Sequence, residues 1–209
     1  MPPRARLALA PLRPLPPPPV RPVRVELRWP LAAPATGPCA VVLDTNIVLD
    51  LLVFADPATA VLRQLLQGGE VRWLATAPMR DELERVLAYP QIAPRVAFYG
   101  LDAAAVLQAY DAQVQWVDVP ARVPVVCRDA DDQRFLDLAA AHRALLLSKD
   151  KAVLAVRKRL LAYGAQVATV LVWAVPGAVR PDATHYAPPE AAPLAAPALV
   201  AAPLVTTPA

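Results

Sequence analysis

The chain has 209 residues and a mass of 22.4 kDa, which is enough for one domain of ordinary size with additional tails. Its net charge of +3 is unevenly placed: residues 1–38 hold six Arg and one acidic residue, whereas residues 39–178 hold 14 Lys and Arg against 15 Asp and Glu. The basic character therefore belongs to a terminal segment, and the charge balance does not predict a strongly basic nucleic-acid-binding domain.

Cysteine and apolar patterning exclude several further classes of protein. Cys39 and Cys127 have no Cys or His neighbours at ligand spacing, so we expect neither a zinc site nor a disulfide framework. Two free thiols are typical of the reducing cytoplasm, which is the location that we expect. No segment approaches the roughly 18 consecutive apolar residues of a membrane span. The apolar run Leu7–Ala10, followed by Pro11, is too short for a secretory signal, so we expect no membrane partner.

Proline divides the chain into three regions. Of the 26 prolines, 12 lie in residues 1–38, seven in residues 39–178 and seven in residues 179–209. The first region includes the run Pro16–Pro19 and favours extended polyproline II structure, because proline cannot donate a backbone hydrogen bond. We expect a disordered arm there, while a proline-rich ligand for a partner domain and a start site placed too far upstream stay open. The Ala/Pro-rich tail of residues 179–209 is expected to be disordered as well.

Between these tails, segments typical of strands alternate with segments typical of helices. The predicted strands are Ala40–Leu43, Val71–Ala75, Trp116–Val117, Leu145–Leu147 and Ala168–Trp173, and the alternating segment Val23–Trp29 is a further candidate. The predicted helices are Ile47–Phe54, Ala58–Gln67, Met79–Tyr89, Asp102–Val114, a helix from Asp131 or Asp132 to His142, and Lys149–Leu161. Strands separated by helices predict an α/β fold whose parallel sheet carries helices on both faces.

Four acidic side chains fall at the ends of these predicted elements or within the first turns of a helix. Asp44 directly follows the first buried strand, and Glu82 lies one turn into its helix. Asp132 opens a helix, and Asp150 follows the strand Leu145–Leu147 by two residues. Open α/β sheets place their ligands at the carboxyl ends of their strands. We therefore expect these four carboxylates to converge at one edge of the sheet.

A cluster of carboxylates is destabilising unless a cation occupies it, because each negative charge raises the pKa of its neighbours. A hard divalent cation with oxygen ligands, Mg²⁺ or Mn²⁺, is the natural occupant, as one ion or as two. Such a cation activates water and neutralises charge on a phosphodiester. Taken singly, each acid also has a structural explanation as a turn residue, a helix cap or, for Glu82, part of a solvated helix face. The order and context of all four favour a site.

These segments resemble the PIN domain, a nuclease family whose bacterial members include the VapC-like toxins of toxin–antitoxin systems. The matching stretches are Val42–Asn46, Met79–Leu87, Asp129–Ala139 and Leu146–Asp150, and the resemblance covers about residues 40–175. It implies a three-layer α/β/α sandwich with a central, mostly parallel sheet. It also implies that residues 39–178 form the nuclease domain.

The resemblance assigns roles to individual residues. It implies that Asp44, Glu82, Asp132 and Asp150 are the catalytic, metal-binding acids and that Asn46 and Ser148 are supporting polar residues. Because Asp131 stands beside Asp132 and Asp129 is close, the assignment of the third acid is open by one position, and Asp132 is favoured by its place in the helix pattern. The sequence Ser148-Lys149-Asp150 replaces the commoner Thr-Gly-Asp but keeps the hydroxyl. Lys149 and Lys151 flank the predicted site and are candidates for contacts with RNA phosphates.

The function implied is a divalent-metal-dependent endoribonuclease that hydrolyses RNA phosphodiesters as the toxin of a toxin–antitoxin pair. The implied partners are an RNA substrate, an antitoxin protein and a second copy of the chain in a homodimer. Two alternatives stay open. One is an RNA- or partner-binding module without significant catalysis, and the other is a nuclease of RNA processing or structured DNA without an antitoxin. A haloacid-dehalogenase-type phosphatase is excluded, because its motif requires a second Asp where Asn46 stands.

Overall fold

The structure is a computed structural model that describes residues 24–29 and 37–174. Most of the predicted N-terminal arm, residues 1–23 and 30–36, lies outside these ranges. So does the whole of the predicted tail, residues 179–209.

Five parallel strands form the central sheet in the order β4-β3-β2-β5-β6. These strands are β2 (Cys39–Leu43), β3 (Val71–Ala75), β4 (Val114–Trp116), β5 (Leu145–Leu147) and β6 (Gln166–Ala168). In the register, Val41 of β2 lies opposite Trp73 of β3 on one side and Leu145 of β5 on the other. The residues Val41–Leu43 and Leu145–Leu147 are buried throughout, as expected for strands covered on both faces. The predicted α/β fold with a parallel sheet is confirmed.

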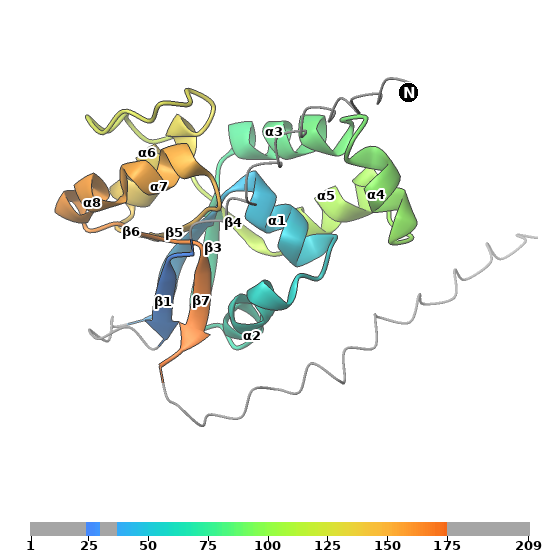
Figure 1. The fold of residues 1–209 in the computed structure, drawn as a ribbon, viewed down its shortest axis with the longest axis horizontal. Helices are drawn as coiled ribbons and strands as arrows, with labels where there is room; N and C mark the ends of the chain where they lie inside the picture. The colour runs from blue at the N-terminus through green and yellow to red at the C-terminus, as the bar shows by residue number, and fades with distance from the viewer. Residues whose placement is uncertain (1–23, 30–36, 175–209) are drawn as a thin grey trace, which may run out of the picture. The chain divides into compact units, whose positions relative to one another are not determined.

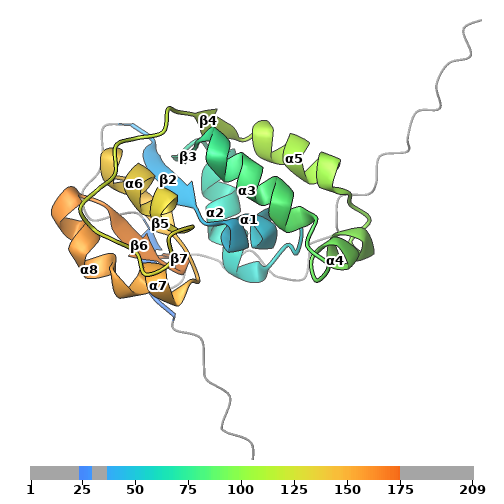
Figure 2. The same cartoon turned by 90° about the horizontal axis from the view of Figure 1, so that it is seen from above.

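Helices cover both faces of this sheet. The first group is α1 (Thr45–Leu52), η1 (Pro57–Thr59), α2 (Ala60–Gln67), α3 (Ala77–Leu87), α4 (Ala93–Phe98) and α5 (Ala103–Asp111). The second group is α6 (Gln133–Ala141), α7 (Lys151–Ala155), α8 (Arg157–Leu160) and η2 (Leu161–Tyr163). Figures 1 and 2 show α1, α3 and α5 on one side of the sheet and α6, α7 and α8 on the other. Helix α6 contacts β2 and β5, the two strands that end at the predicted acids.

Helix α6 is anchored in the core by three large apolar side chains. Phe135, Leu136 and Leu138 are at most 1% exposed, and burial of each such side chain contributes about 1.5–3 kcal/mol.

Within the described residues, no single helix is long and apolar enough to cross a membrane. Helix α1 and the segment η1–α2 reach that length and composition only together, and they meet at a bend of 99°.

The helices differ from the predicted ones at two places. Helix α4 was not predicted, because Pro90 was taken as the end of a helix, whereas Pro94 lies in the first turn of a new one. The predicted helix Lys149–Leu161 is divided at Val156, whose backbone (φ −96°, ψ 1°) leaves the helical region. There the guanidinium of Arg157 donates to the carbonyl of Leu154 at 2.9 Å. This bond occupies a backbone acceptor that a continuous helix would use.

A second, two-stranded sheet pairs β1 (Glu26–Trp29) in parallel with β7 (Val170–Trp173). The strand candidate at Val23–Trp29 is therefore present. The predicted strand Ala168–Trp173 is in fact two strands, because β6 ends at Ala168 and β7 begins at Val170 in a different sheet.

Thr169, between β6 and β7, makes the connection to β1. Its hydroxyl accepts from the N–H of Val25 at 2.9 Å and donates to the carbonyl of Val25 at 3.0 Å, while its own N–H donates to the same carbonyl at 2.8 Å. Further along β1, the indole N–H of Trp29 donates to the carboxylate of Glu70 at 3.1 Å. Two side chains thus attach β1 to the domain in addition to its backbone pairing with β7.

We predict that Thr169→Val lowers the free energy of unfolding by about 1–2 kcal/mol, because the N–H of Val25 loses its partner. Chemical denaturation monitored by far-UV circular dichroism measures this change. Thr76→Val is the matched control, since Thr76 is also buried but makes no side-chain capping bond. An equal loss of stability in both variants would contradict the assigned role of Thr169.

Candidate functional site

Asp44 is the central residue of the candidate site. It follows β2, occupies the N-cap position of α1 and is only 4% exposed. Its N–H donates to the carbonyl of Leu147 at 3.0 Å, which brings the carboxyl ends of β2 and β5 together. Its Oδ2 accepts hydrogen bonds from the hydroxyl of Ser148 and, at 2.9 Å, from the amide of Asn46. Both predicted supporting residues therefore contact Asp44.

The electrostatic environment of Asp44 disfavours a bare negative charge. Burial raises the pKa of Asp44, and the nearby carboxylate of Asp150 raises it further. The hydrogen bonds from Ser148 and Asn46 act in the opposite direction and lower the pKa. Because burial is the largest effect, a cation beside Asp44 would stabilise its charged form.

Glu82 faces this residue from α3. Its Oε1 accepts from the hydroxyl of Thr45 at 3.0 Å, and its Oε2 lies 3.3 Å from Nη1 of Arg134. Oε2 is nevertheless buried without a hydrogen-bond partner. Burial raises the pKa of Glu82, Thr45 and Arg134 lower it, and Asp44 raises it. Glu82 is thus close enough to Asp44 for their charges to interact.

Asp132 contributes the third carboxylate, from the N-cap position of α6. Its Oδ2 is buried without a hydrogen-bond partner. Burial raises the pKa of Asp132 to about 7, and the charges of Asp44 and Asp150 add to this effect. Its neighbour Asp131 is different, because its side chain is 86% exposed and lies 3.6 Å from Arg134. Asp132 is thus the member of this pair that the charges of Asp44 and Asp150 affect.

Asp150 contributes the fourth carboxylate, from the N-cap position of α7. Its Oδ1 accepts from the N–H of Ala152 at 2.6 Å, and its own N–H donates to the hydroxyl of Ser148 at 3.0 Å. Ser148 is fully buried, and its hydroxyl donates to the carboxylate of Asp44 and accepts from the backbone N–H of Asp150. One hydroxyl fixes the relative position of two of the four acids.

Two residues of the site were not assigned a role from the sequence. Thr45 and Arg134 both contact Glu82, through a hydrogen bond and an ion pair respectively. Both lie inside stretches that carry the family resemblance, Val42–Asn46 and Asp129–Ala139. Their types gave no signal of their own, because a threonine at a helix start and an arginine on a helix are common on any protein.

The two candidate phosphate-binding lysines have different surroundings. The ammonium of Lys149 contacts the carboxylates of Asp50 and, at 3.1 Å, Asp56. The bond from Lys149 lowers the pKa of Asp50, although burial has the larger effect and raises it. Lys151, the first residue of α7, is exposed. Contacts of either lysine with RNA phosphates stay a prediction, and Lys149 has a structural partner in addition.

The four carboxylates fit a divalent cation in donor type and in charge. Their oxygens are hard ligands of the kind that Mg²⁺ and Mn²⁺ prefer, and two of these oxygens, Glu82 Oε2 and Asp132 Oδ2, are buried without a hydrogen-bond partner. In residues 24–29 and 37–174, however, no group of three or more His, Cys, Asp or Glu side chains has the geometry of a formed metal site. In this structure the four carboxylates therefore act on one another through their charges.

The fold and this acidic site define an α/β protein with a carboxylate cluster at the carboxyl edge of a parallel sheet. The family profile of the PIN domain matches residues 40–152, more than half of the chain and a range that includes all four acids. The chain therefore belongs to the PIN-domain family. PIN domains are generally nucleases, which supports a hydrolase.

Other comparisons are more distant. No curated protein matches the chain in sequence. One solved structure, the crystal structure of VapBC2 from Rickettsia felis bound to a DNA fragment from their promoter, is similar over 62% of this chain and 98% of that chain. The two are 12% identical, with a TM-score of 0.43.

We predict that the metal-free protein loses stability as the pH rises from about 4 to 7. The pKa of Asp132 is raised from 3.8 to about 7, so the folded state holds this proton more tightly than the unfolded chain does. The stability that this raised pKa contributes is fully present below the pKa of Asp132 in the unfolded chain. It is lost as the pH rises through the pKa of Asp132 in the folded state. The raised pKa values of Asp44 and Glu82 act with the same sign. Denaturation in EDTA at several pH values measures the slope.

The controls for this prediction are Asp132→Asn, which should flatten the slope, and Asp118→Asn, which removes an exposed carboxylate outside the site and should retain it. Addition of Mg²⁺ at pH 8 should restore stability, because a ligand of the folded state stabilises that state. A slope that is identical in all three proteins would contradict the assigned coupling of Asp132.

Proposed function

We propose that this PIN domain is a divalent-metal-dependent endoribonuclease that hydrolyses RNA phosphodiesters. The observation that carries the proposal is the group of four carboxylates of Asp44, Glu82, Asp132 and Asp150, in which Glu82 Oε2 and Asp132 Oδ2 are buried without hydrogen-bond partners. Membership of a family of nucleases supports the same reaction class.

In this proposal, Asp44, Glu82, Asp132 and Asp150 hold one or two ions of Mg²⁺ or Mn²⁺. The ion, when bound, supplies activation of a water molecule and neutralises charge on the phosphodiester. The other residues hold the acids in place. Ser148 and Asn46 fix Oδ2 of Asp44, Thr45 fixes Oε1 of Glu82, and Arg134 offsets part of the charge of Glu82. Such outer contacts restrict each carboxylate to one orientation.

The biological setting is the finer part of the proposal. The family includes VapC-like toxins, so we propose an antitoxin protein as a partner, a homodimer as the assembly and the cytoplasm as the location. A small gene next to that of this protein, whose product suppresses both growth inhibition and RNA cleavage, would support the toxin role. Growth that is unaffected by expression of an active nuclease would instead favour a role in RNA processing.

We predict that Asp44→Asn lowers RNA cleavage in Mg²⁺ or Mn²⁺ by more than about a hundredfold, because the central ligand loses its charge. Asparagine retains an oxygen for the bonds from Ser148 and Asn46, so circular dichroism should report an intact fold. Asp118→Asn removes the same charge at an exposed position outside the site and should leave activity unchanged. Full activity of Asp44→Asn, or activity that EDTA does not inhibit, would refute the assigned site.

Ser148→Ala tests the support of the site. The change removes one hydrogen bond from Asp44 and the acceptor of the Asp150 N–H, so we expect kcat/KM to fall about 10- to 100-fold. The Mg²⁺ concentration that gives half-maximal activity should rise with it, which a purely structural role would not predict. Ser148→Thr retains the hydroxyl and should be less affected than Ser148→Ala. If both variants behave alike, the hydroxyl has no role in orienting the acids.

A binding module without significant catalysis is the second candidate. It is favoured by aromatic side chains that face solvent at Phe98 and Tyr99. Metal-dependent cleavage that disappears in Asp44→Asn would exclude this alternative. Metal and RNA binding without cleavage of any RNA tested would establish it.

A further inference from the structure

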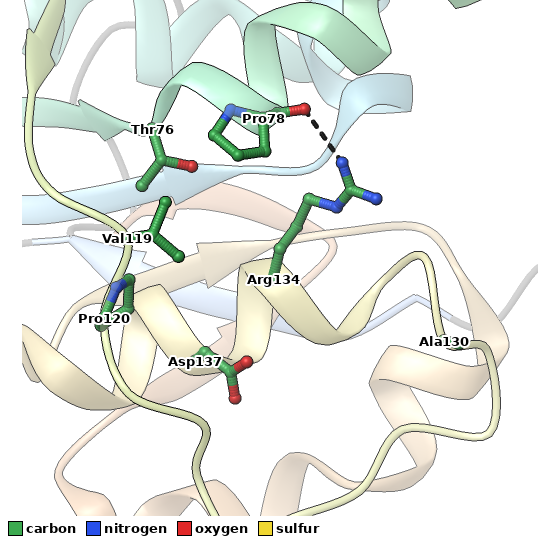
Figure 3. A pocket seen from close by; sticks show the side chains of 7 residues that line it. All are labelled: Thr76, Pro78, Val119, Pro120, Ala130, Arg134 and Asp137. Carbon is green, nitrogen blue, oxygen red and sulfur yellow. Dashed lines mark hydrogen bonds between the residues drawn. The ribbon is translucent and has the colours of Figure 1, made fainter.

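A cavity of about 280 Å³ lies next to the acidic site. The cavity is lined by the start of α3, by the loop between β4 and α6 and by two positions of α6 that lie one turn apart, and Figure 3 shows the side chains of these residues. The lining residues used below are Thr76, Pro78, Val119, Pro120, Arg134 and Asp137. None of them belongs to the four carboxylates of the candidate active site.

Arg134 connects the cavity to the acidic site. Its Nη1 lies 3.3 Å from Oε2 of Glu82 and donates to the carbonyl of Pro78 at 2.9 Å, the bond drawn as a dashed line in Figure 3. Its Nε donates to the carbonyl of Asp131 at 2.9 Å. The guanidinium is thus fixed between Glu82 and the cavity. Arg134 therefore contacts Glu82 of the acidic site and also lines the cavity.

Asp137 supplies a fixed hydrogen-bond acceptor to the same cavity. Its Oδ1 accepts from the N–H of Val123 at 2.9 Å and from Nε2 of Gln133 at 2.8 Å. Both bonds use one oxygen, so Oδ2 keeps its capacity to accept from a ligand. The carboxylate is already ordered, and a ligand does not have to immobilise it.

The walls of the cavity favour a flat ligand with a polar edge. Pro78, Val119 and Pro120 present apolar surface, whereas the carboxylate of Asp137 accepts hydrogen bonds. The volume lies near the lower limit of small-molecule sites, about 300 Å³, and therefore suits a single base rather than a longer segment. Single-stranded RNA is recognised in this way, with an unstacked base inserted between side chains and its Watson–Crick edge hydrogen-bonded.

We propose that this cavity is a subsite for one nucleobase of the RNA substrate, next to the scissile phosphodiester. The inference rests on the proposed nuclease function. The carboxylate acceptor of Asp137 selects a base whose ring nitrogen carries an N–H on the Watson–Crick edge. On their Watson–Crick edges, guanine and uracil have this arrangement and adenine and cytosine do not. In this subsite, Oδ2 of Asp137 accepts from the ring N–H.

The test measures binding, not cleavage. The wild-type protein in Mg²⁺ is titrated with each of the four ribonucleoside 5′-monophosphates and with ribose 5-phosphate as the base-free probe. Backbone amide NMR shifts locate the binding. We expect the guanine and uracil nucleotides to bind about tenfold more tightly than ribose 5-phosphate and to shift the amides of Thr76, Val119 and Ala130, which border the cavity.

Asp137→Asn is the discriminating variant. Asparagine retains one oxygen for the bonds from Val123 and Gln133, but it presents an NH₂ donor to the cavity where the wild type presents an acceptor. The tenfold preference should disappear, while affinity for ribose 5-phosphate, which also reports an intact fold, should not change. Asp118→Asn, an exposed residue of the same loop outside the cavity lining, should behave like the wild type.

The subsite is overturned if the base adds no affinity, if Asp137→Asn keeps the preference, or if the shifted amides lie away from the cavity. RNA cleavage by the same protein samples is recorded separately. Cleavage without base preference would overturn the subsite alone. A base preference at this cavity without cleavage would contradict the proposed nuclease function but retain the base-binding site.

Discussion

Repulsion between like charges in a poorly solvated place is the constraint on which this structure depends. Asp44 is almost fully buried, and the charges of Glu82, Asp132 and Asp150 act on it or on one another. The protein reduces this repulsion with hydrogen-bond donors at Asp44 and with the guanidinium of Arg134 at Glu82. These contacts position the acids but do not neutralise them, so the repulsion that remains lowers the stability of the domain.

The parallel sheet makes this concentration of charge possible. Strands β2 and β5 are neighbours, so the chain leaves both strands at the same edge, and Asp44 and Ser148 meet there although they are far apart in sequence. Helices α3 and α6 lie on opposite sides of the sheet and bring Glu82 and Asp132 to the same place. Buried apolar side chains hold these four elements together, and this packing keeps the acids from moving apart.

Much of this arrangement was predictable from the sequence, and the reasons for the exceptions are physical. Strand β3 and the position of Asp44 follow from local patterns, because apolar runs and polar stops are properties of neighbouring residues. The contacts of Thr45 and Arg134 with Glu82 join residues far apart in sequence, and no local pattern encodes them. The division of the last strand at Thr169 was also missed, because it depends on the partner Val25 and not on the residues beside it.

The pairing of β1 with β7 has a consequence for any shortened form of the chain. Strand β1 lies in the region that composition marks as an arm, yet it covers a row of backbone groups on β7. A protein that lacked residues 1–38 would expose that row as an open strand edge. Open edges recruit strands from other molecules and promote aggregation. Strand β1 therefore caps the edge of β7, and we expect its removal to reduce the solubility of the protein.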